Sequence, residues 1–262
     1  HHVKNKNNLF AVDKLTAIYF NVLGLPAPRN LPRIVGGNLT TIDKYPSMAV
    51  ILRTNDYIHY GHNCGGTIIN NRSVLTAAHC IDTCIVEGNR VRLGSSYANS
   101  GGEVLMIAAA IAHPDHDYTV SYDYDIAVLR TSVIIEYKDN ISPAPIAGSN
   151  YNLADDEVVW AAGWGITELG SLSEQLRDVQ VWTINQEICR ARYGAINGTD
   201  IITPNMLCTG WLDVGIRDQC DGDSGGPVFH RGVLVGVCSF GGACGDPVYP
   251  GVNVRVSSFT PS

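Results

Sequence analysis

Three short stretches of the sequence carry side chains that could act together in catalysis. They are Thr76-Ala-Ala-His79-Cys80, Asp123-Tyr-Asp125-Ile-Ala-Val-Leu129 and Gly222-Asp-Ser224-Gly-Gly-Pro227. Each has an ordinary interpretation when taken alone, because a partly buried histidine, an aspartate that caps a strand and a serine in a turn are all common. Their occurrence together, in this order, instead predicts nucleophilic catalysis by His79, Asp125 and Ser224.

Each of these side chains has a distinct chemical task in such a reaction. A serine hydroxyl is a weak nucleophile, so Ser224 needs a general base within hydrogen-bond reach. His79 could accept the proton and return it to the leaving group. A buried Asp125 would hold the imidazole in the right tautomer and stabilise its charged form. The glycines beside Ser224 would let the backbone N–H groups of Gly222 and Ser224 converge as an oxyanion hole.

Strands must position these side chains, because no long stretch shows helical periodicity. Short apolar runs separated by Gly, Asn, Pro and Ser predict an all-β protein. The expected strands are Met48–Leu52, Thr67–Ile69, Val74–Thr76, Arg90–Leu93, Val104–Ala110, Ile126–Leu129, Glu157–Ala162, Gln175–Thr183, Pro227–Phe229, Val233–Cys238 and Gly251–Val256. Asn70-Asn71 indicates a tight hairpin, and Asn185 is placed to cap one short helix at Gln186–Tyr193. The Pro-rich segment Ile141–Ser149 is typical of a linker between two β units.

Composition excludes several classes of protein. The 262 residues are enough for one large or two small domains. Lys and Arg number 18 against 25 Asp and Glu, a net charge of −7, which is unfavourable for nucleic-acid binding. The eight cysteines lack zinc-type spacing and predict disulfides in an oxidising compartment. We expect no metal, no cofactor and no nucleic-acid partner.

The N-terminal region suggests export from the cell. Leu15–Leu25 is an apolar run preceded by Lys14 and followed by the small residue Ala27, as in a secretory signal peptide. The run is too short to span a bilayer. The alternative is a buried strand or a helical turn. Because the chain starts with His1 and an acidic residue precedes the run, we interpret residues 1–14 as a sequence artefact or a tag.

The motifs resemble those of the chymotrypsin-like serine proteases, and within that family the trypsins. The resemblance covers nearly all of residues 34–256 and rests on Arg33-Ile34-Val-Gly-Gly37, Cys64-Gly-Gly-Thr67, the three stretches above, Gly163-Trp-Gly165 and Tyr249-Pro-Gly251-Val252. It implies two six-stranded antiparallel β-barrels with the active site in the cleft between them. The first barrel would span about 34–145 and the second about 146–262.

The resemblance also implies that the chain is made as a zymogen. Residues 1–33 would be a signal and pro-segment, and residues 34–262 the peptidase domain. Cleavage after Arg33 would free the amine of Ile34, which would form a buried ion pair with Asp223. A buried carboxylate without a partner is costly, so the loop that carries the Gly222 amide would settle only after cleavage.

Substrate preference follows from the same resemblance. Asp218 would form the floor of the primary specificity pocket and select Arg or Lys side chains by charge pairing. Gln219 could donate a hydrogen bond to the substrate or partly fill the pocket, which leaves the preference between Arg and Lys open. Asp221 is expected to face solvent. The other expected substrate-binding residues are Ser239, Phe240, Gly241, Gly251 and Tyr193.

Cysteine pairing is open from the cysteine count alone. The resemblance implies the pairs Cys64–Cys80, Cys189–Cys208 and Cys220–Cys244. Cys84 and Cys238 are left over, and we expect both to be free thiols. Alternation along its strand would point Cys238 toward the pocket wall.

Three departures from the family pattern lead to further expectations. The stretch Gly94–Glu103 holds only one carboxylate, Glu103, so we predict no bound calcium. The chain stops at Ser262, before the helix that ends the family fold, and we interpret this as a truncated coding sequence. After Arg33 the only lysines are Lys44 and Lys138. A strong excess of Arg suits alkaline fluid and resembles trypsins of the lepidopteran larval gut, with compositional drift as the alternative.

These features predict a secreted, monomeric, trypsin-like endopeptidase that works through an acyl-enzyme and is digestive, with the gut lumen as one location. Its partners would be protein or peptide substrates with Arg or Lys at the cleaved bond, an activating protease and proteinaceous trypsin inhibitors. One alternative is a regulatory cascade protease. Another is a catalytically silent homologue that acts as a binding or decoy protein, although such proteins usually lose the serine or the histidine.

Overall fold

The computed structural model describes residues 36–81, 86–116, 122–167, 170–197 and 201–261. The expected signal and pro-segment, residues 1–33, lies outside these residues, as do Ile34 and Cys84. Within the described ranges, every helix is too short or too polar to cross a membrane.

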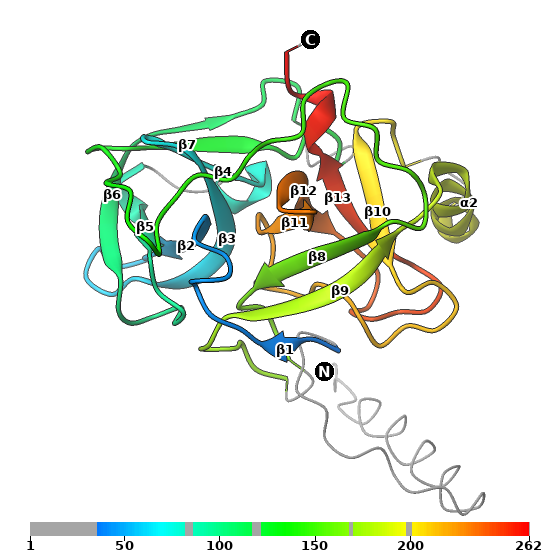
Figure 1. Ribbon diagram of the computed structural model, residues 1–262, viewed down its shortest axis with the longest axis horizontal. Coiled ribbons are helices and arrows are strands. Elements are labelled where there is room, and N and C mark those ends of the chain that lie inside the picture. Colours follow the sequence, from blue (N-terminus) through cyan, green and yellow to red (C-terminus); the bar gives the residue numbers. More distant parts are fainter. Residues whose placement is uncertain (1–35, 82–85, 117–121, 168–169, 198–200, 262) are drawn as a thin grey trace, which may run out of the picture. The chain divides into compact units, whose positions relative to one another are not determined.

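The first half of the chain forms a closed antiparallel barrel of six strands (Figure 1). The apolar side chains lie inside this barrel. Residues alternate between buried and half-buried along β5 (Asn89–Leu93), and Met48–Leu52 of β2 are all buried. In barrel order the strands are β2 (Met48–Arg53), β3 (Gly61–Asn70), β4 (Ser73–Thr76), β7 (Ala127–Thr131), β6 (Glu103–Ala112) and β5 (Asn89–Leu93). Short 3₁₀ turns η1 (Ala78–Cys80) and η2 (Val86–Gly88) follow β4 and precede β5.

The second half forms another ring of six antiparallel strands, because β8 pairs with both β9 and β11. The strands in order are β8 (Val158–Gly163), β9 (Arg177–Thr183), β10 (Met206–Gly210), β13 (Gly251–Arg255), β12 (Val233–Phe240) and β11 (Pro227–His230). Helix α2 (Gln186–Asn197) precedes β10, and the 3₁₀ turn η3 (Val256–Ser258) follows β13. Two six-stranded barrels are therefore confirmed.

Each expected strand overlaps an observed strand, and two strands were not expected. All five residues of β10 are buried, as in β4 and β11, but its sequence Met-Leu-Cys-Thr-Gly holds only one β-branched residue and ends in Gly, so its strand signal is weak. Strand β1 (Asn38–Leu39) has only two residues and pairs with β9. Helix α2 ends at Asn197 rather than at Tyr193. The Asn185 side-chain oxygen accepts hydrogen bonds from the N–H groups of Glu187 and Ile188, at 3.0 and 3.2 Å.

Several segments join the two barrels. In the linker, the Ala144 N–H donates to the carbonyl of Ile68 in β3, and the Ala147 N–H donates to the carbonyl of Leu234 in β12. Two segments also contact the barrel on the other side of the boundary that was expected between residues 145 and 146. Strand β1 pairs with β9 of the second barrel, and Phe259 packs edge-on against His113 beyond β6. Buried side chains of both barrels consequently form one continuous hydrophobic cluster.

Candidate active site

His79 is held by the turn that follows strand β4. It is the middle residue of η1, and the next residue, Cys80, forms a disulfide with Cys64 in β3. The disulfide therefore fastens the turn to the neighbouring strand. Cys64, His79 and Cys80 lie close together, but the two sulfurs are bonded to each other and offer no thiolate to a metal ion.

Asp125 lies just before β7 and is completely buried. Its Oδ2 is 2.7 Å from His79 Nδ1, and its Oδ1 accepts a hydrogen bond from the His79 backbone N–H at 2.9 Å. An ionised carboxylate can only accept, so the proton of a neutral His79 ring is held on Nδ1. Nε2 is left with a lone pair that can accept a proton from a nucleophile.

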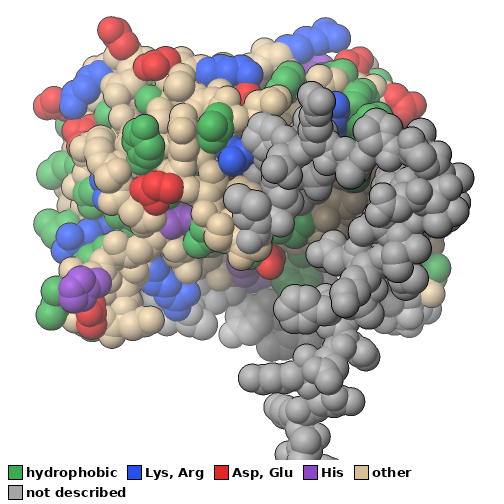
Figure 2. Space-filling view, turned by 90° about the horizontal axis from the view of Figure 1, so that it is seen from below, with side chains coloured by type: hydrophobic (Ala, Val, Ile, Leu, Met, Phe, Trp, Pro, Cys, Tyr) green, Lys and Arg blue, Asp and Glu red, His purple; other side chains and the backbone are tan. Residues whose placement is uncertain are grey.

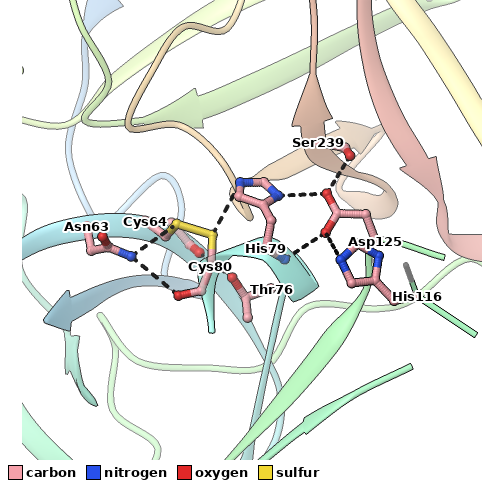
Figure 3. Close-up of a disulfide and its surroundings, with 9 residues drawn as sticks. Asn63, Cys64, Thr76, His79, Cys80, His116, Asp125 and Ser239 are labelled. Atoms are coloured by element: carbon pink, nitrogen blue, oxygen red, sulfur yellow. Dashed lines mark hydrogen bonds and ion pairs between the residues drawn. A yellow bond between two sulfur atoms is a disulfide. The ribbon is translucent and has the colours of Figure 1, made fainter. Parts of the chain in front are cut away.

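Asp125 also has a partner from the second barrel. The hydroxyl of Ser239, in β12, donates to Asp125 Oδ2 at 2.5 Å. Figure 3 shows the Asp125 carboxylate between His79, Ser239 and His116. Burial by itself would raise the pKa of Asp125, but hydrogen bonds from His79 and Ser239 outweigh it and leave the pKa below its usual value.

Ser224 lies in a tight loop of the second barrel that touches the strand leading to His79. The Ser224 carbonyl accepts a hydrogen bond from the Gly65 N–H of β3 at 2.8 Å. Gly225 has φ of +76°, and a Cβ there would overlap Thr76 Oγ1 at the end of β4. Only glycine allows this approach, which brings the loop to within a few residues of η1.

Gly222 occupies a similarly restricted position. Its φ is +92°, and a Cβ would lie 2.6 Å from Leu172 Cδ2 and 3.2 Å from Gly165 Cα. Glycine therefore lets the loop beside Ser224 pack closely against the Gly165 backbone. Backbone N–H groups in such a loop can stabilise a developing negative charge.

A small cavity of about 80 Å³ opens beside Ser224. The sequence-predicted residues that line it include Asp218, Gln219, Asp221, Ser224, Ser239, Phe240, Gly241 and Gly251. A larger hollow of about 910 Å³ lies along the linker, between Lys44 and Trp160, and contains none of these residues. The cavity beside Ser224 therefore brings a serine hydroxyl and a buried carboxylate together.

Asp218 is 6% exposed and supplies that charge. Its carboxylate accepts hydrogen bonds from the N–H groups of Gln219 and Gly245, at 2.9 and 3.2 Å. Burial raises the pKa of Asp218 to about 7, although these two hydrogen bonds oppose the rise. Among the described residues, no lysine or arginine forms an ion pair with it.

The walls of the cavity keep access to Asp218 open. A Cβ on Gly251 would lie 2.7 Å from Asp218 Oδ1, so any side chain there would crowd the carboxylate. Tyr193 is buried, and its hydroxyl donates to the carbonyl of Pro250, next to Gly251, at 2.6 Å. Phe240 stacks on Tyr122 with ring centroids 4.9 Å apart.

Gln219 and Cys238 are two unusual residues of the cavity. Gln219 is 7% exposed, and its Nε2 has no hydrogen-bond partner in the described part of the chain. Cys238 is a buried free thiol that contributes to the cavity lining, as expected from alternation. Burial raises the pKa of Cys238 well above that of an ordinary thiol, and the nearby carboxylates add to the rise.

Asp223 is completely buried directly before Ser224. Its two carboxylate oxygens accept hydrogen bonds from the N–H groups of Gly165 and Cys220, at 2.7 and 3.0 Å. A Cβ on Gly163 or Gly165 would overlap the carboxylate, so these glycines form a fitted cradle around it. Burial raises the pKa of Asp223 to about 6, against the effect of the two hydrogen bonds.

The structure contains the three disulfides implied by the resemblance. Cys64 is joined to Cys80, Cys189 to Cys208 and Cys220 to Cys244. The second bridge connects α2 to β10, and the third connects the segment before Ser224 to the loop after β12. The walls of the cavity are therefore covalently tied together.

Two histidines near the site were not recognised from the sequence. His116 lies beside Asp125, and His62 packs edge-on against Trp164 with ring centroids 6.3 Å apart. Burial lowers the pKa of His62, and the backbone of Gly222 partly offsets this effect. Neither histidine belongs to a motif. The only sequence signal for His116 is its place in the acidic stretch that precedes Asp125.

Comparisons with known proteins agree with this geometry. The trypsin family model matches residues 34–262. The chain is 53% identical to Trypsin CFT-1 of Choristoneura fumiferana over 234 residues, which is 89% of this chain and 90% of that protein. It is 53% identical to Trypsin, alkaline C of Manduca sexta, with the same coverage. It is 52% identical to Trypsin, alkaline A of Manduca sexta over 242 residues, or 90% and 93% of the two chains.

Proposed function

The chain belongs to the trypsin family and is a serine endopeptidase, and from this premise we propose that it cleaves peptide bonds after Arg and Lys. The single observation that supports this specificity is the Asp218 carboxylate, which is buried at the cavity beside Ser224. A buried carboxylate without a cation is unfavourable, and an arginine or lysine side chain of a substrate would supply the missing charge. Gln219 lies beside it and would contact the end of that side chain.

The reaction would proceed through an acyl-enzyme. The Ser224 hydroxyl attacks the carbonyl carbon of the scissile bond while His79 Nε2 takes its proton. Asp125 stabilises the imidazolium that forms, and the N–H groups of Gly222 and Ser224 bind the oxyanion. His79 then gives the proton to the leaving amine. Water, deprotonated by His79, attacks the ester carbonyl and releases the acid product and the Ser224 hydroxyl.

The chain would be made as an inactive precursor that is cleaved after Arg33. The new amine of Ile34 would bind Asp223, whose carboxylate is buried and receives only N–H donors among the described residues. An ammonium group would compensate the negative charge that burial disfavours. Asp223 is next to Gly222 and Ser224, so its ion pair would fix the oxyanion hole.

We further propose that the enzyme is secreted, monomeric and digestive. Three disulfides suit an oxidising, extracellular location. Figure 2 shows basic and acidic side chains mixed over the part of this face that grey atoms do not cover. This mixture suits a protein that acts on peptides rather than on nucleic acid. Three relatives, all from Manduca sexta, carry the word alkaline in their names, which agrees with the excess of arginine over lysine among residues 34–262 of this chain. Protein inhibitors of trypsins would bind the same cleft.

The test uses protein that has been cleaved after Arg33. Matched chromogenic peptides that end in Arg, Lys, Phe or Ala are compared, with the Ser224→Ala variant as the control for background hydrolysis. Fast release after Arg and Lys, absent in the variant, would support the proposal. Release after Phe would mean that Asp218 does not set specificity, and no release from any peptide would favour a silent homologue.

A further inference from the structure

Three asparagines of the described chain begin the acceptor pattern for N-linked glycans, in which the second residue after the asparagine is Ser or Thr. The three patterns are Asn38-Leu-Thr40, Asn71-Arg-Ser73 and Asn140-Ile-Ser142. A fourth, Asn197-Gly-Thr199, extends into residues outside the described ranges. The pattern is short and arises by chance, so the surroundings of each asparagine have to be compared. Asn71 and Asn140 both belong to the first barrel and differ most clearly.

Asn71 lies at the tip of the hairpin that joins β3 to β4 and is exposed. The backbone of this turn is held on both sides of it. Asn70 Oδ1 accepts a hydrogen bond from the Arg72 N–H at 2.9 Å, and the Asn71 carbonyl accepts one from the Ile135 N–H at 2.8 Å. The Asn71 side chain itself forms no hydrogen bond with another described residue. Its amide nitrogen is therefore open to water.

The next two residues of the pattern are held by the barrel. The Arg72 guanidinium donates to the carbonyls of Thr131 and Ser132, at 3.1 Å each, and Ser73 is 9% exposed. None of these contacts uses the Asn71 side chain. A large polar group attached to the Asn71 amide would consequently displace none of them, and such groups require a place on the surface.

Asn140 has the opposite surroundings. Its Nδ2, the atom to which a glycan would be attached, donates a hydrogen bond to the Gly94 carbonyl at 2.8 Å. A Cβ on Gly94 would lie only 3.1 Å from this nitrogen, so the amide is packed closely against the neighbouring loop. The side chain is partly buried, and the next residue, Ile141, is 2% exposed. A glycan on Asn140 would have to break this contact.

We propose that Asn71 is a site of N-linked glycosylation and that Asn140 remains unmodified in the mature protein. The inference rests on the proposed secretion, because the modification takes place in the secretory pathway. The donor would be an oligosaccharide joined to a lipid through pyrophosphate. A bond forms between Asn71 Nδ2 and the anomeric carbon of the sugar while the bond from that carbon to the pyrophosphate breaks. The lipid pyrophosphate leaves, and the amide gives up one proton.

A glycan on Asn71 would leave the active site accessible. Thr76, at the other end of β4, meets Gly225 of the loop that carries Ser224. The four residues of β4 lie between the hairpin tip and this contact, and a strand of that length extends over about 10 Å. The glycan would therefore start beyond the end of β4 that is remote from Ser224. We expect it to leave kcat/KM unchanged.

The test maps the glycans on protein secreted from cultured insect cells. The Ser224→Ala chain, which cannot digest itself, is exported with a standard secretory signal and treated with a peptide N-glycosidase in heavy-oxygen water. This enzyme converts each asparagine that carries a glycan into a labelled aspartate. Peptide mass spectrometry should find the label at position 71 and an unmodified Asn140. An unmodified Asn71, or a glycan on Asn140, would overturn the inference.

Intact masses and kinetics provide matched controls. Asn71→Gln should lower the mass of the secreted protein by one glycan, whereas Asn140→Gln should leave the attached glycan mass unchanged. With Ser224 intact, Asn71→Gln should cleave an Arg peptide with the kcat/KM of wild type, and a lower value would contradict the placement of the glycan away from the cleft. A parallel expression relies on residues 1–33 for export. Failure of export there alone would count against the proposed secretion, while the glycan map would still decide the role of Asn71.

Discussion

Asp125 combines complete burial with the retention of its negative charge. Burial removes water from the carboxylate, which disfavours ionisation. Three hydrogen bonds, two from His79 and one from Ser239, replace that water. The result is a charge held in a low-dielectric setting, where it acts on His79 more strongly than it would in water.

We expect Asp125→Asn to fold and to lose most of its activity. An amide could donate to His79 Nδ1 and so favour the wrong tautomer of the ring. The known cost of this substitution in Ser-His-Asp triads is about 10⁴-fold in kcat, and we expect the same order here. Kinetics with an Arg peptide measure the loss, and circular dichroism shows whether the fold is intact. A loss below tenfold would remove Asp125 from the mechanism.

At Asp218, the raised pKa leads to a prediction about cation binding. Because this pKa is about 7, the carboxylate is largely neutral below that pH and ionised above it. The affinity for benzamidine, a small cation, should therefore fall by roughly tenfold per unit as the pH drops below about 7. Inhibition constants measured against pH check this. Asp218→Asn should bind weakly at every pH, and a wild-type affinity independent of pH would refute the prediction.

At the scale of elements, the loop around Ser224 depends on close contact with the first barrel. Residues 222–226 approach strands β3 and β4 so tightly that Gly225 meets Thr76 and Gly65. Closed barrels are rigid supports, because every strand is paired on both edges. Ser224 therefore lies on a loop whose position is set by two strands of the other barrel.

We predict that Gly225→Ala abolishes activity and destabilises the fold by a few kcal/mol. Its Cβ would overlap Thr76 Oγ1 and lie 2.6 Å from the Gly65 carbonyl oxygen. Gly232→Ala is the matched control, because Gly232 also has positive φ, +81°, but has open space around it. Gly232→Ala should lower the free energy of unfolding by only about 1 kcal/mol. Denaturant unfolding measures both, and equal losses would show that backbone strain, not the contact between barrels, explains the effect.

At the scale of the whole molecule, buried acids such as Asp223 lower the stability of the fold when they are ionised. Asp223 has a folded pKa of about 6, above the ordinary value of 3.8. A group whose pKa is raised on folding contributes stability below its unfolded pKa and loses it as the pH rises through its folded pKa. The loss for Asp223 therefore falls between about pH 4 and about pH 6. Cleavage after Arg33 would offset it with an ion pair.

The raised pKa of Asp223 predicts that the free energy of unfolding depends on pH differently in two aspartate variants. Both are made in an Arg33→Gln, Ser224→Ala background, which cannot be cleaved after residue 33. The free energy of unfolding of Asp223→Asn should exceed that of its parent by an amount that grows to about 3 kcal/mol as the pH rises from about 4 to about 7. Asp221→Asn is the control, because Asp221 is exposed. Thermal or denaturant unfolding at several pH values provides the measurement. Parallel curves for Asp223→Asn and its parent would mean that this carboxylate already has a cation partner before cleavage.

The sequence by itself determined the family, the two-barrel fold and many of the residues that line the cavity beside Ser224. His79, Asp125 and Ser224 each lie in a short motif. The backbone around Ser224 also requires particular residues, because Gly222 and Gly225 have positive φ. Strand patterns were clear where one face of a strand is buried, as in β5. They failed at β10, whose sequence Met-Leu-Cys-Thr-Gly holds only one β-branched residue.

Only the tertiary structure decided which polar groups surround these residues. Ser239 and Asp125 are 114 positions apart and meet because the barrels pack together. His116 faces the same carboxylate although no motif contains it. The burial of Asp218 and Asp223 likewise depends on residues from several elements, as does the lack of a partner for Gln219 Nε2 among the described residues. Electrostatics follow from desolvation and distance, and neither is encoded in a single stretch of sequence.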